Sequence, residues 1–137
     1  MRKLIIVLVV FVGVACEEDN SSEYVIRVDR VDAPAQIGPS DTLKARIFGR
    51  VGVSDCYSLR RVELVRSNSL GRLDVTAIGY HSDPAGFHPC GAIIVSLDEP
   101  IMAVPPYATP PSAARTFTIA VHQPGGEVTL VLVEVQE

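Results

Sequence analysis

Apolar and polar residues alternate with a period of two along several short stretches, and this pattern limits the fold more than any other feature of the chain. The stretches 42–49 (TLKARIFG), 72–80 (RLDVTAIGY) and 115–122 (RTFTIAVH) show it most clearly. Successive side chains of a strand point to opposite faces, so this period predicts strands with one buried and one wet face. Helical spacing is absent beyond residue 15, and the domain is therefore expected to be all-β.

About seven strands are expected, separated by stretches rich in proline and glycine. Two such stretches, 33–41 and 105–114, are predicted to be loops, and the slipped alternation at Arg60–Arg61 predicts a bulge or a strand break. Short antiparallel strands at this spacing favour a two-sheet antiparallel sandwich of the immunoglobulin or fibronectin type, with a small barrel as the alternative. The expected strands are 24–31, 42–49, 56–67, 72–80, 92–100, 115–122 and 127–135, and the last two are expected to form a hairpin around a glycine-containing turn.

The first sixteen residues form a unit of their own. Arg2 and Lys3 precede twelve uncharged residues, 4–15, which would make about 18 Å of helix. A bilayer core of about 30 Å needs roughly 20 residues, so a secretory signal peptide is favoured over a spanning helix. A buried first strand is the remaining alternative, and the polar residues after Cys16 argue against it.

Residues 12–16 (VGVAC) resemble the lipobox of bacterial lipoprotein signal peptides, with Ala15 before the cysteine and Gly13 where leucine is usual. The resemblance implies that Cys16 carries diacylglycerol and an acylated amine, and that the mature chain begins there. It also implies a lipid-anchored cell-envelope protein, with the outer membrane as its expected location. Residues 17–19 (EED) resemble the acidic export tether of some Gram-negative surface lipoproteins, and an ordinary solvated linker is the alternative. The periplasmic and the surface face both stay open.

The chain therefore divides into a signal peptide (1–15), a lipidated cysteine with a flexible acidic tether (16–23) and a domain (24–137). This domain resembles the small immunoglobulin-like modules of bacterial envelope lipoproteins, although the chain has no tryptophan. The formal net charge of −4, without a basic stripe, argues against nucleic-acid binding, which requires clustered Lys and Arg.

Cys56 and Cys90 remain once Cys16 is assigned to lipid. In an oxidising compartment paired thiols tend to form a disulfide, so a Cys56–Cys90 bridge is predicted. Two free thiols and a metal site are the alternatives.

The stretch 81–90 (HSDPAGFHPC) is the one place where metal-ligating residue types gather. No recognised metal-binding spacing and no catalytic motif is present, so we expect a polar loop, no metal, no cofactor and no enzymatic activity. A small envelope hydrolase or metal-dependent enzyme that uses this loop is the alternative function. The ligand types are His81, Asp83, His88 and Cys90.

A non-catalytic binding or structural module, with a protein or glycan partner, is the expected function. Tyr107 in a proline-rich frame (PPYATPP) and the pair Phe87 and His88 are the candidate binding residues, because stiff loops lose little entropy on binding. For Tyr107, packing against the end of the sandwich is favoured over a binding role. His122 is expected on an outer face. The stretch 130–133 (LVLV) is apolar on both faces, so its strand is either covered on both sides, which we favour, or meets a partner.

Overall fold

A computed structural model of the 137-residue chain describes residues 22–107 and 116–136, and these form nine strands and one turn of 3₁₀ helix. The predicted signal peptide, Cys16 and the acidic residues 17–19 lie outside the described residues, as does much of the proline-rich loop. The strands are β1 (Glu23–Val25), β2 (Val28–Asp32), β3 (Gln36–Ile37), β4 (Leu43–Ser54), β5 (Tyr57–Ser67), β6 (Arg72–His81), β7 (Ala92–Ala103), β8 (Thr116–His122) and β9 (Val128–Val135), and the helical turn is η1 (Pro124–Gly126).

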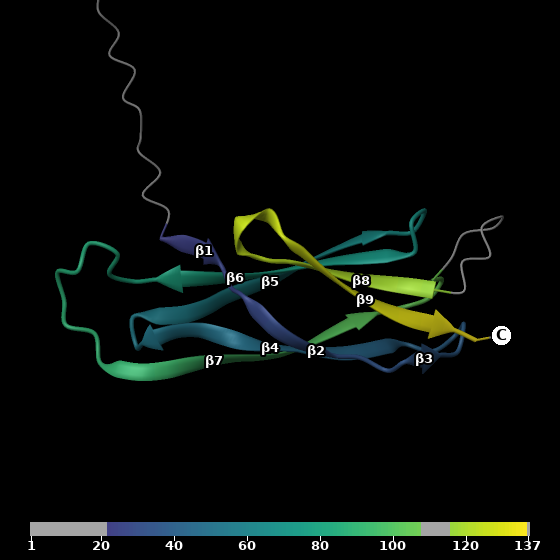
Figure 1. The fold of residues 1–137 in the computed structure, drawn as a ribbon, viewed down its shortest axis with the longest axis horizontal. Helices are drawn as coiled ribbons and strands as arrows, with labels where there is room; N and C mark the ends of the chain where they lie inside the picture. Colours follow the sequence, from purple (N-terminus) through teal and green to yellow (C-terminus); the bar gives the residue numbers. More distant parts are fainter. Residues whose placement is uncertain (1–21, 108–115, 137) are drawn as a thin grey trace, which may run out of the picture.

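The strands form two facing sheets with the core between them (Figure 1). The larger sheet has the order β1-β6-β8-β9-β3, and β5 also pairs with β6. The smaller sheet has the order β2-β4-β7. The predicted alternation is confirmed on the long strands, and the all-β, two-sheet architecture is confirmed instead of the small barrel. The largest fully buried side chains are Phe117, Ile26, Leu43, Ile47, Leu97, Ile119, Val75, Val121 and Val133.

The larger sheet is mixed, so the expectation of purely antiparallel sheets is wrong. β8 runs parallel to β6, with Arg72 opposite Thr118 and Val75 opposite Val121, and β3 runs parallel to β9. The reason lies in the connection: after β6 the chain crosses to the smaller sheet as β7, and it then returns in the direction of β6. No local pattern in the sequence reports such a crossover.

The chain has nine strands among its described residues where about seven were expected, because two segments behave differently from the prediction. The expected strand 24–31 divides into β1, on the larger sheet, and β2, on the smaller one. Gln123 holds the chain where it passes from one sheet to the other. Its side chain accepts a hydrogen bond from the Val28 N–H (3.0 Å) and donates one to the Val28 carbonyl (2.9 Å). Within the predicted loop 33–41, β3 adds a short parallel pair to β9.

Two local predictions are confirmed. The register between β5 and β6 shifts between Leu59 and Arg61, which is the bulge expected at the adjacent arginines. The end of the chain forms the predicted hairpin, in which β8 pairs antiparallel with β9. Gly125 and Gly126, at φ of 81° and 84°, make its turn, in a region of φ that glycine adopts without strain.

Candidate binding surfaces

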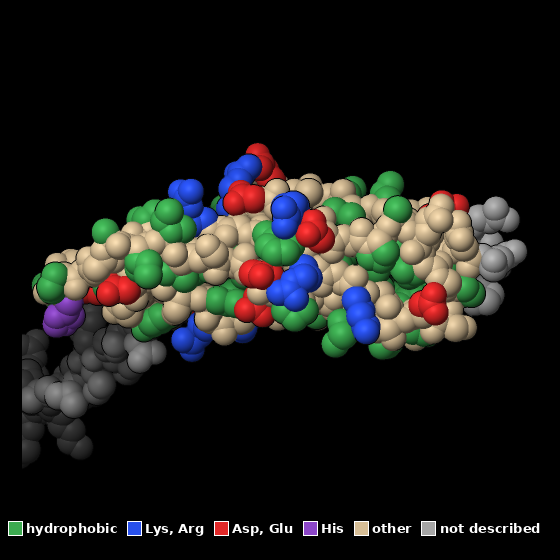
Figure 2. Space-filling view, turned by 90° about the horizontal axis from the view of Figure 1, so that it is seen from below, with side chains coloured by type: hydrophobic (Ala, Val, Ile, Leu, Met, Phe, Trp, Pro, Cys, Tyr) green, Lys and Arg blue, Asp and Glu red, His purple; other side chains and the backbone are tan. Residues whose placement is uncertain are grey.

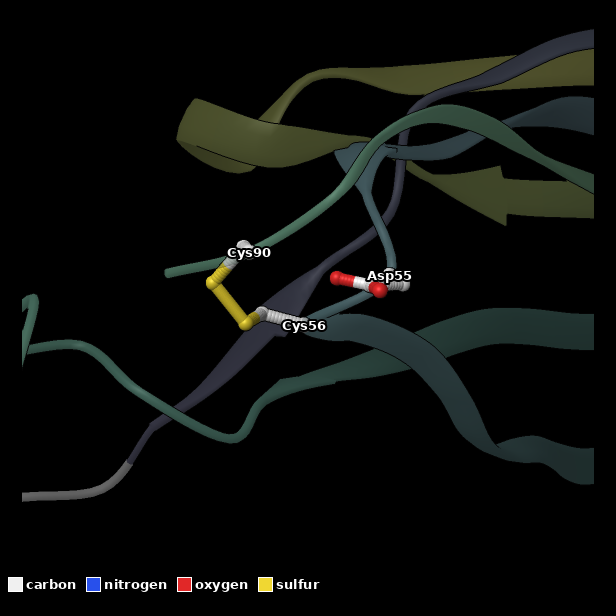
Figure 3. Close-up of side chains that lie close together, drawn as sticks. All are labelled: Asp55, Cys56 and Cys90. Atoms are coloured by element: carbon white, nitrogen blue, oxygen red, sulfur yellow. A yellow bond between two sulfur atoms is a disulfide. The ribbon is translucent and has the colours of Figure 1, made fainter. Parts of the chain in front are cut away.

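A disulfide closes one end of the sandwich. Cys56 lies in the turn between β4 and β5, and Cys90 lies in the loop between β6 and β7. Their Cα atoms are 5.6 Å apart and the sulfur atoms are bonded, as predicted (Figure 3). Beside them, the Asp55 carboxylate accepts a hydrogen bond from the Gly91 N–H at 2.7 Å. The disulfide and several hydrogen bonds therefore tie the loop 82–91 to the β4–β5 turn.

Asp83 fixes the course of this loop. Its two carboxylate oxygens accept hydrogen bonds from the N–H groups of His88 (2.7 Å) and Phe87 (3.0 Å). These bonds, the one from His88 above all, hold the pKa of Asp83 below its ordinary value, since they favour the charged form. Asp83 is also one of the few buried polar side chains among the described residues. The carboxylate acts as a structural clamp for the loop.

Three of the four metal-ligating residue types of the loop, all but the exposed His88, are engaged in other contacts. His81 stacks on the ring of Tyr57, with centroids 4.3 Å apart. Asp83 holds the two loop amides, and Cys90 is bonded to Cys56. Within 22–107 and 116–136, the one group of three metal-ligating side chains that lie together consists of Asp55, Cys56 and Cys90, whose sulfurs are bonded to each other (Figure 3).

An aromatic group that the sequence did not predict packs behind the disulfide. Tyr57 contacts His81 on one side and meets the edge of Tyr24 on the other. Burial, followed by the proximity of Tyr57, raises the pKa of Tyr24, whose hydroxyl donates to the Val51 carbonyl. Gly52 makes room for this arrangement, because a Cβ there would stand 2.2 Å from the Tyr57 ring. The disulfide end of the loop therefore lies next to a packed group of aromatic rings.

Tyr107 is a core residue rather than an exposed binding residue. Only 3% of it is exposed, and its ring meets the Phe117 ring edge-on with centroids 5.1 Å apart. Its hydroxyl accepts from the Leu43 N–H (2.8 Å) and donates to the carbonyls of Ala103 (2.9 Å) and Asp41. Packing at the end of the sandwich, the favoured expectation for this residue, is what the structure shows.

Phe87 and His88 remain accessible. Phe87 is 83% exposed, and His88 beside it is also exposed. The structure brings these two predicted binding residues together with the disulfide at one end of the molecule. Tyr107, the third candidate, is separate from them and buried.

The outer face of the larger sheet carries a charged cluster that sequence analysis did not find. His122 on β8 lies 2.7 Å from the Asp74 carboxylate on β6, and Arg72 contacts the same carboxylate at 2.7 Å. Arg72, followed by His122, holds the pKa of Asp74 below its ordinary value. His122 lies on the outer face, as expected, but it has partners because β6 and β8 pair in parallel.

An apolar row lies beside this cluster, on β9. Val128, Leu130 and Leu132 are 42%, 57% and 63% exposed, whereas Val133 on the opposite face is fully buried. The favoured expectation that β9 is covered on both sides is therefore wrong. The edge of this strand is open as well: among the residues that the structure describes, β3 pairs with β9 only at Glu134 and Val135.

The outer face of the smaller sheet has a different character. Charged side chains gather along its middle (Figure 2), and several are paired: Arg46 lies 2.6 Å from Asp98, and Arg30 lies 3.1 Å from Asp32. A shallow groove of about 640 Å³ runs beside them, with Pro34 and Met102 in its lining. The groove is open and shallow, and the charged side chains of Asp32 and Arg46 in its lining are paired with Arg30 and Asp98.

Comparison of the chain with families of proteins, with curated proteins and with solved structures gives no match. In the two described ranges, no helix is long and apolar enough to cross a bilayer.

Proposed function

We propose that the protein is a lipid-anchored cell-envelope lipoprotein whose β-sandwich is a non-catalytic protein-binding module. The observation that carries the binding role is the exposed row on β9, where Val128, Leu130 and Leu132 face solvent on a strand with an open edge. The anchor is supported by the VGVAC motif, which ends at Cys16, seven residues before the first strand begins at Glu23. An outer-membrane location, on either face, belongs to the same proposal.

The finer assignment of an immunoglobulin-like or fibronectin-like sandwich also belongs to the proposal. Two facing sheets with an alternating core support it, and the parallel pair β6–β8 departs from the antiparallel pattern of such domains. The Cys56–Cys90 disulfide is consistent with an oxidising compartment.

The chemistry of β9 favours a protein partner with an extended segment. The N–H groups of Glu134 and Gln136 point toward β3 and donate to the carbonyls of Ala35 and Ile37. Because backbone direction alternates along a strand, the N–H groups of Leu130 and Leu132 point to the same edge, where no described strand continues β3. An added strand could pair with these groups and place its own side chains beside the apolar row. A glycan would satisfy the backbone less well and leave the row exposed.

The alternative of a hydrolase or metal-dependent enzyme at 81–90 is less well supported. Asp83 and Cys90 are held by loop amides and by the disulfide, and His81 stacks on Tyr57. An enzyme at this loop would need those contacts to break before substrate or metal could bind.

The anchor is tested by membrane fractionation of the full chain and its Cys16→Ser variant. We expect the unaltered protein to stay in the membrane pellet after high-salt and carbonate washes, and the variant to be released. Intact mass of the mature protein gives a second readout, because lipidation adds acyl chains at Cys16. A serine variant that resists both washes would refute the lipid anchor.

The binding surface is tested by a photo-crosslinking amino acid placed at Leu132 in cells that make the full chain. We expect a discrete protein adduct from Leu132 that disappears when Leu130→Lys is added, and no such adduct from a matched exposed position, Met102 on the smaller sheet. Equal adducts from both positions, or an adduct from Leu132 that survives Leu130→Lys, would remove β9 as the binding surface.

A further inference from the structure

Exposed apolar side chains gather at the disulfide end, where the loop 82–91 meets the ends of β4 and β7. Phe87 is almost fully exposed, and Val53, Ile93 and Ile94 are each more than half exposed. Strand register brings the last three together, because Ser54 lies opposite Ala92 and Gly52 opposite Val95. We call these four residues the apolar tip. Exposed apolar side chains grouped at one end of the molecule indicate a surface that contacts a membrane or another protein in the functional state.

The chain enters the described structure at this same end. The His81 N–H, at the start of the loop, donates to the Ser22 carbonyl at 2.9 Å, and Glu23 lies opposite Tyr80. Figure 1 shows β1 on the side of the molecule where the loop between β6 and β7 projects. Ser22 lies six positions after Cys16, and a chain of that length spans at most about 20–22 Å.

The charges at this end do not oppose contact with lipid. Residues 81–95 and 51–57 contain no Lys or Arg, and their two carboxylates, Asp55 and Asp83, accept hydrogen bonds from loop amides. Hydrophobic side chains are spread over the face shown in Figure 2, and at its left end they lie with a histidine and an acidic side chain, while Lys and Arg lie nearer the middle. The acidic residues 17–19 make attraction to anionic headgroups unfavourable, so contact would rest on apolar burial instead of charge.

The loop presents its aromatic residue in a fixed position. Asp83 clamps the amides of Phe87 and His88, and the Cys56–Cys90 disulfide holds the end of the loop. A loop whose backbone is already held loses little entropy when a surface covers it.

We propose that the apolar tip inserts into the interfacial layer of the membrane that holds the acyl chains of Cys16. The inference rests on the proposed lipid anchor and adds a second, protein-made contact to it. The domain then stands with its disulfide end on the bilayer, and the row on β9 runs away from the lipid surface.

The absence of tryptophan from the chain allows a direct test. Phe87→Trp in the full, acylated protein introduces a single reporter at the apolar tip. In phosphatidylcholine vesicles with brominated acyl chains we expect its emission to shift to shorter wavelength and to be quenched. The matched control is Met102→Trp, also more than half exposed but at the opposite end of β7, and it should stay unshifted and unquenched.

Flotation of the same vesicles separates the two proposals. Protein that does not float with the lipid refutes the anchor, and the tip contact falls with it. Protein that floats while Phe87→Trp and Met102→Trp are quenched equally, or not at all, overturns the tip contact alone. A blue shift without quenching that grows with protein density assigns the tip to a second copy of the chain and also overturns it. Quenching that needs anionic lipid contradicts the apolar basis of the contact.

Discussion

Two loops, at opposite ends of the sandwich, each contain an aromatic residue close to prolines, and they treat it in opposite ways. Tyr107 is buried, and its hydroxyl binds three backbone groups, whereas Phe87 is 83% exposed. The described start of one loop, residues 104–107, is held by its aromatic side chain. The other is held by a disulfide and by Asp83, and its aromatic residue is left outside.

The difference shows that a stiff, proline-rich loop does not by itself make its aromatic residue a binding residue. A phenolic hydroxyl can satisfy buried backbone groups, so Tyr107 can serve as the fastener of its loop. Phenylalanine has no such group. Where other bonds fasten the loop, a phenylalanine is free to face solvent, a membrane or a partner.

The largest effect on the free energy of unfolding is expected from truncation of the buried Tyr107 side chain. Tyr107→Ala should lower the free energy of unfolding by about 3–5 kcal/mol, because it removes a buried ring and leaves a cavity beside Phe117. The matched control Phe87→Ala should change it by less than about 0.5 kcal/mol, since that side chain is exposed. Urea denaturation measures both. Similar losses in the two variants would break the comparison between the loops.

Removal of the Cys56–Cys90 disulfide should have the second-largest effect on the free energy of unfolding. The Cys56→Ala/Cys90→Ala variant loses roughly 3–4 kcal/mol on the chain-entropy model, given a sequence separation of 34 residues. Reduction of the unaltered protein should lower its stability by a similar amount, and the same reductant should leave the double variant unchanged. A double variant as stable as the oxidised parent would show that the bridge does not fasten the fold.

A smaller effect isolates the polar part of Tyr107. Tyr107→Phe keeps the ring but leaves the buried Leu43 N–H without its acceptor, at a cost of about 1–3 kcal/mol in unfolding free energy. Urea denaturation compared with that of Tyr107→Ala separates the contribution of the hydroxyl from that of the ring. If the phenylalanine variant matches the parent, the hydroxyl is not what fastens this loop.

The smallest effect is local and depends on pH. Loop amides lower the pKa of Asp83 in the folded protein below its ordinary 3.8, so the stabilisation is fully present above pH 3.8. It is lost as pH falls through the lower, folded value. NMR should show the Phe87 and His88 amide signals moving in that range while the Val75 signal, from the core, stays in place. In Asp83→Asn these shifts should be absent, and if they persist another group controls the loop.

Local features of the fold were predictable from sequence, and pairing between distant strands was not. The alternation in 72–80 and 115–122 located β6 and β8, and the adjacent arginines located the bulge in β5. The parallel pairing of β6 with β8 depends on a crossover through the other sheet, which no period of two encodes. The division of 24–31 between two sheets likewise depends on Gln123, which is distant in sequence.

The candidate site was predictable to a similar extent. Pairing of Cys56 with Cys90 followed from counting cysteines, but the burial of Tyr107 depends on Leu43 and Ala103, which only the fold brings to it. For β9, a segment apolar on both faces indicates burial or a partner equally well. Only the position of the strand in the sheet shows that Val128, Leu130 and Leu132 are exposed.

The place of β9 in the sheet bears on the timing of folding. β9 pairs with β8 and with β3, and it contributes the fully buried Val133, so some of the first and last strands of the domain must meet before the larger sheet is complete. If the chain is secreted N-terminus first, as the proposed leader requires, the sandwich cannot close until residues 128–135 have left the translocation channel. In that case the order of the strands keeps the polypeptide unfolded, and able to pass through the channel, until its transport is nearly finished.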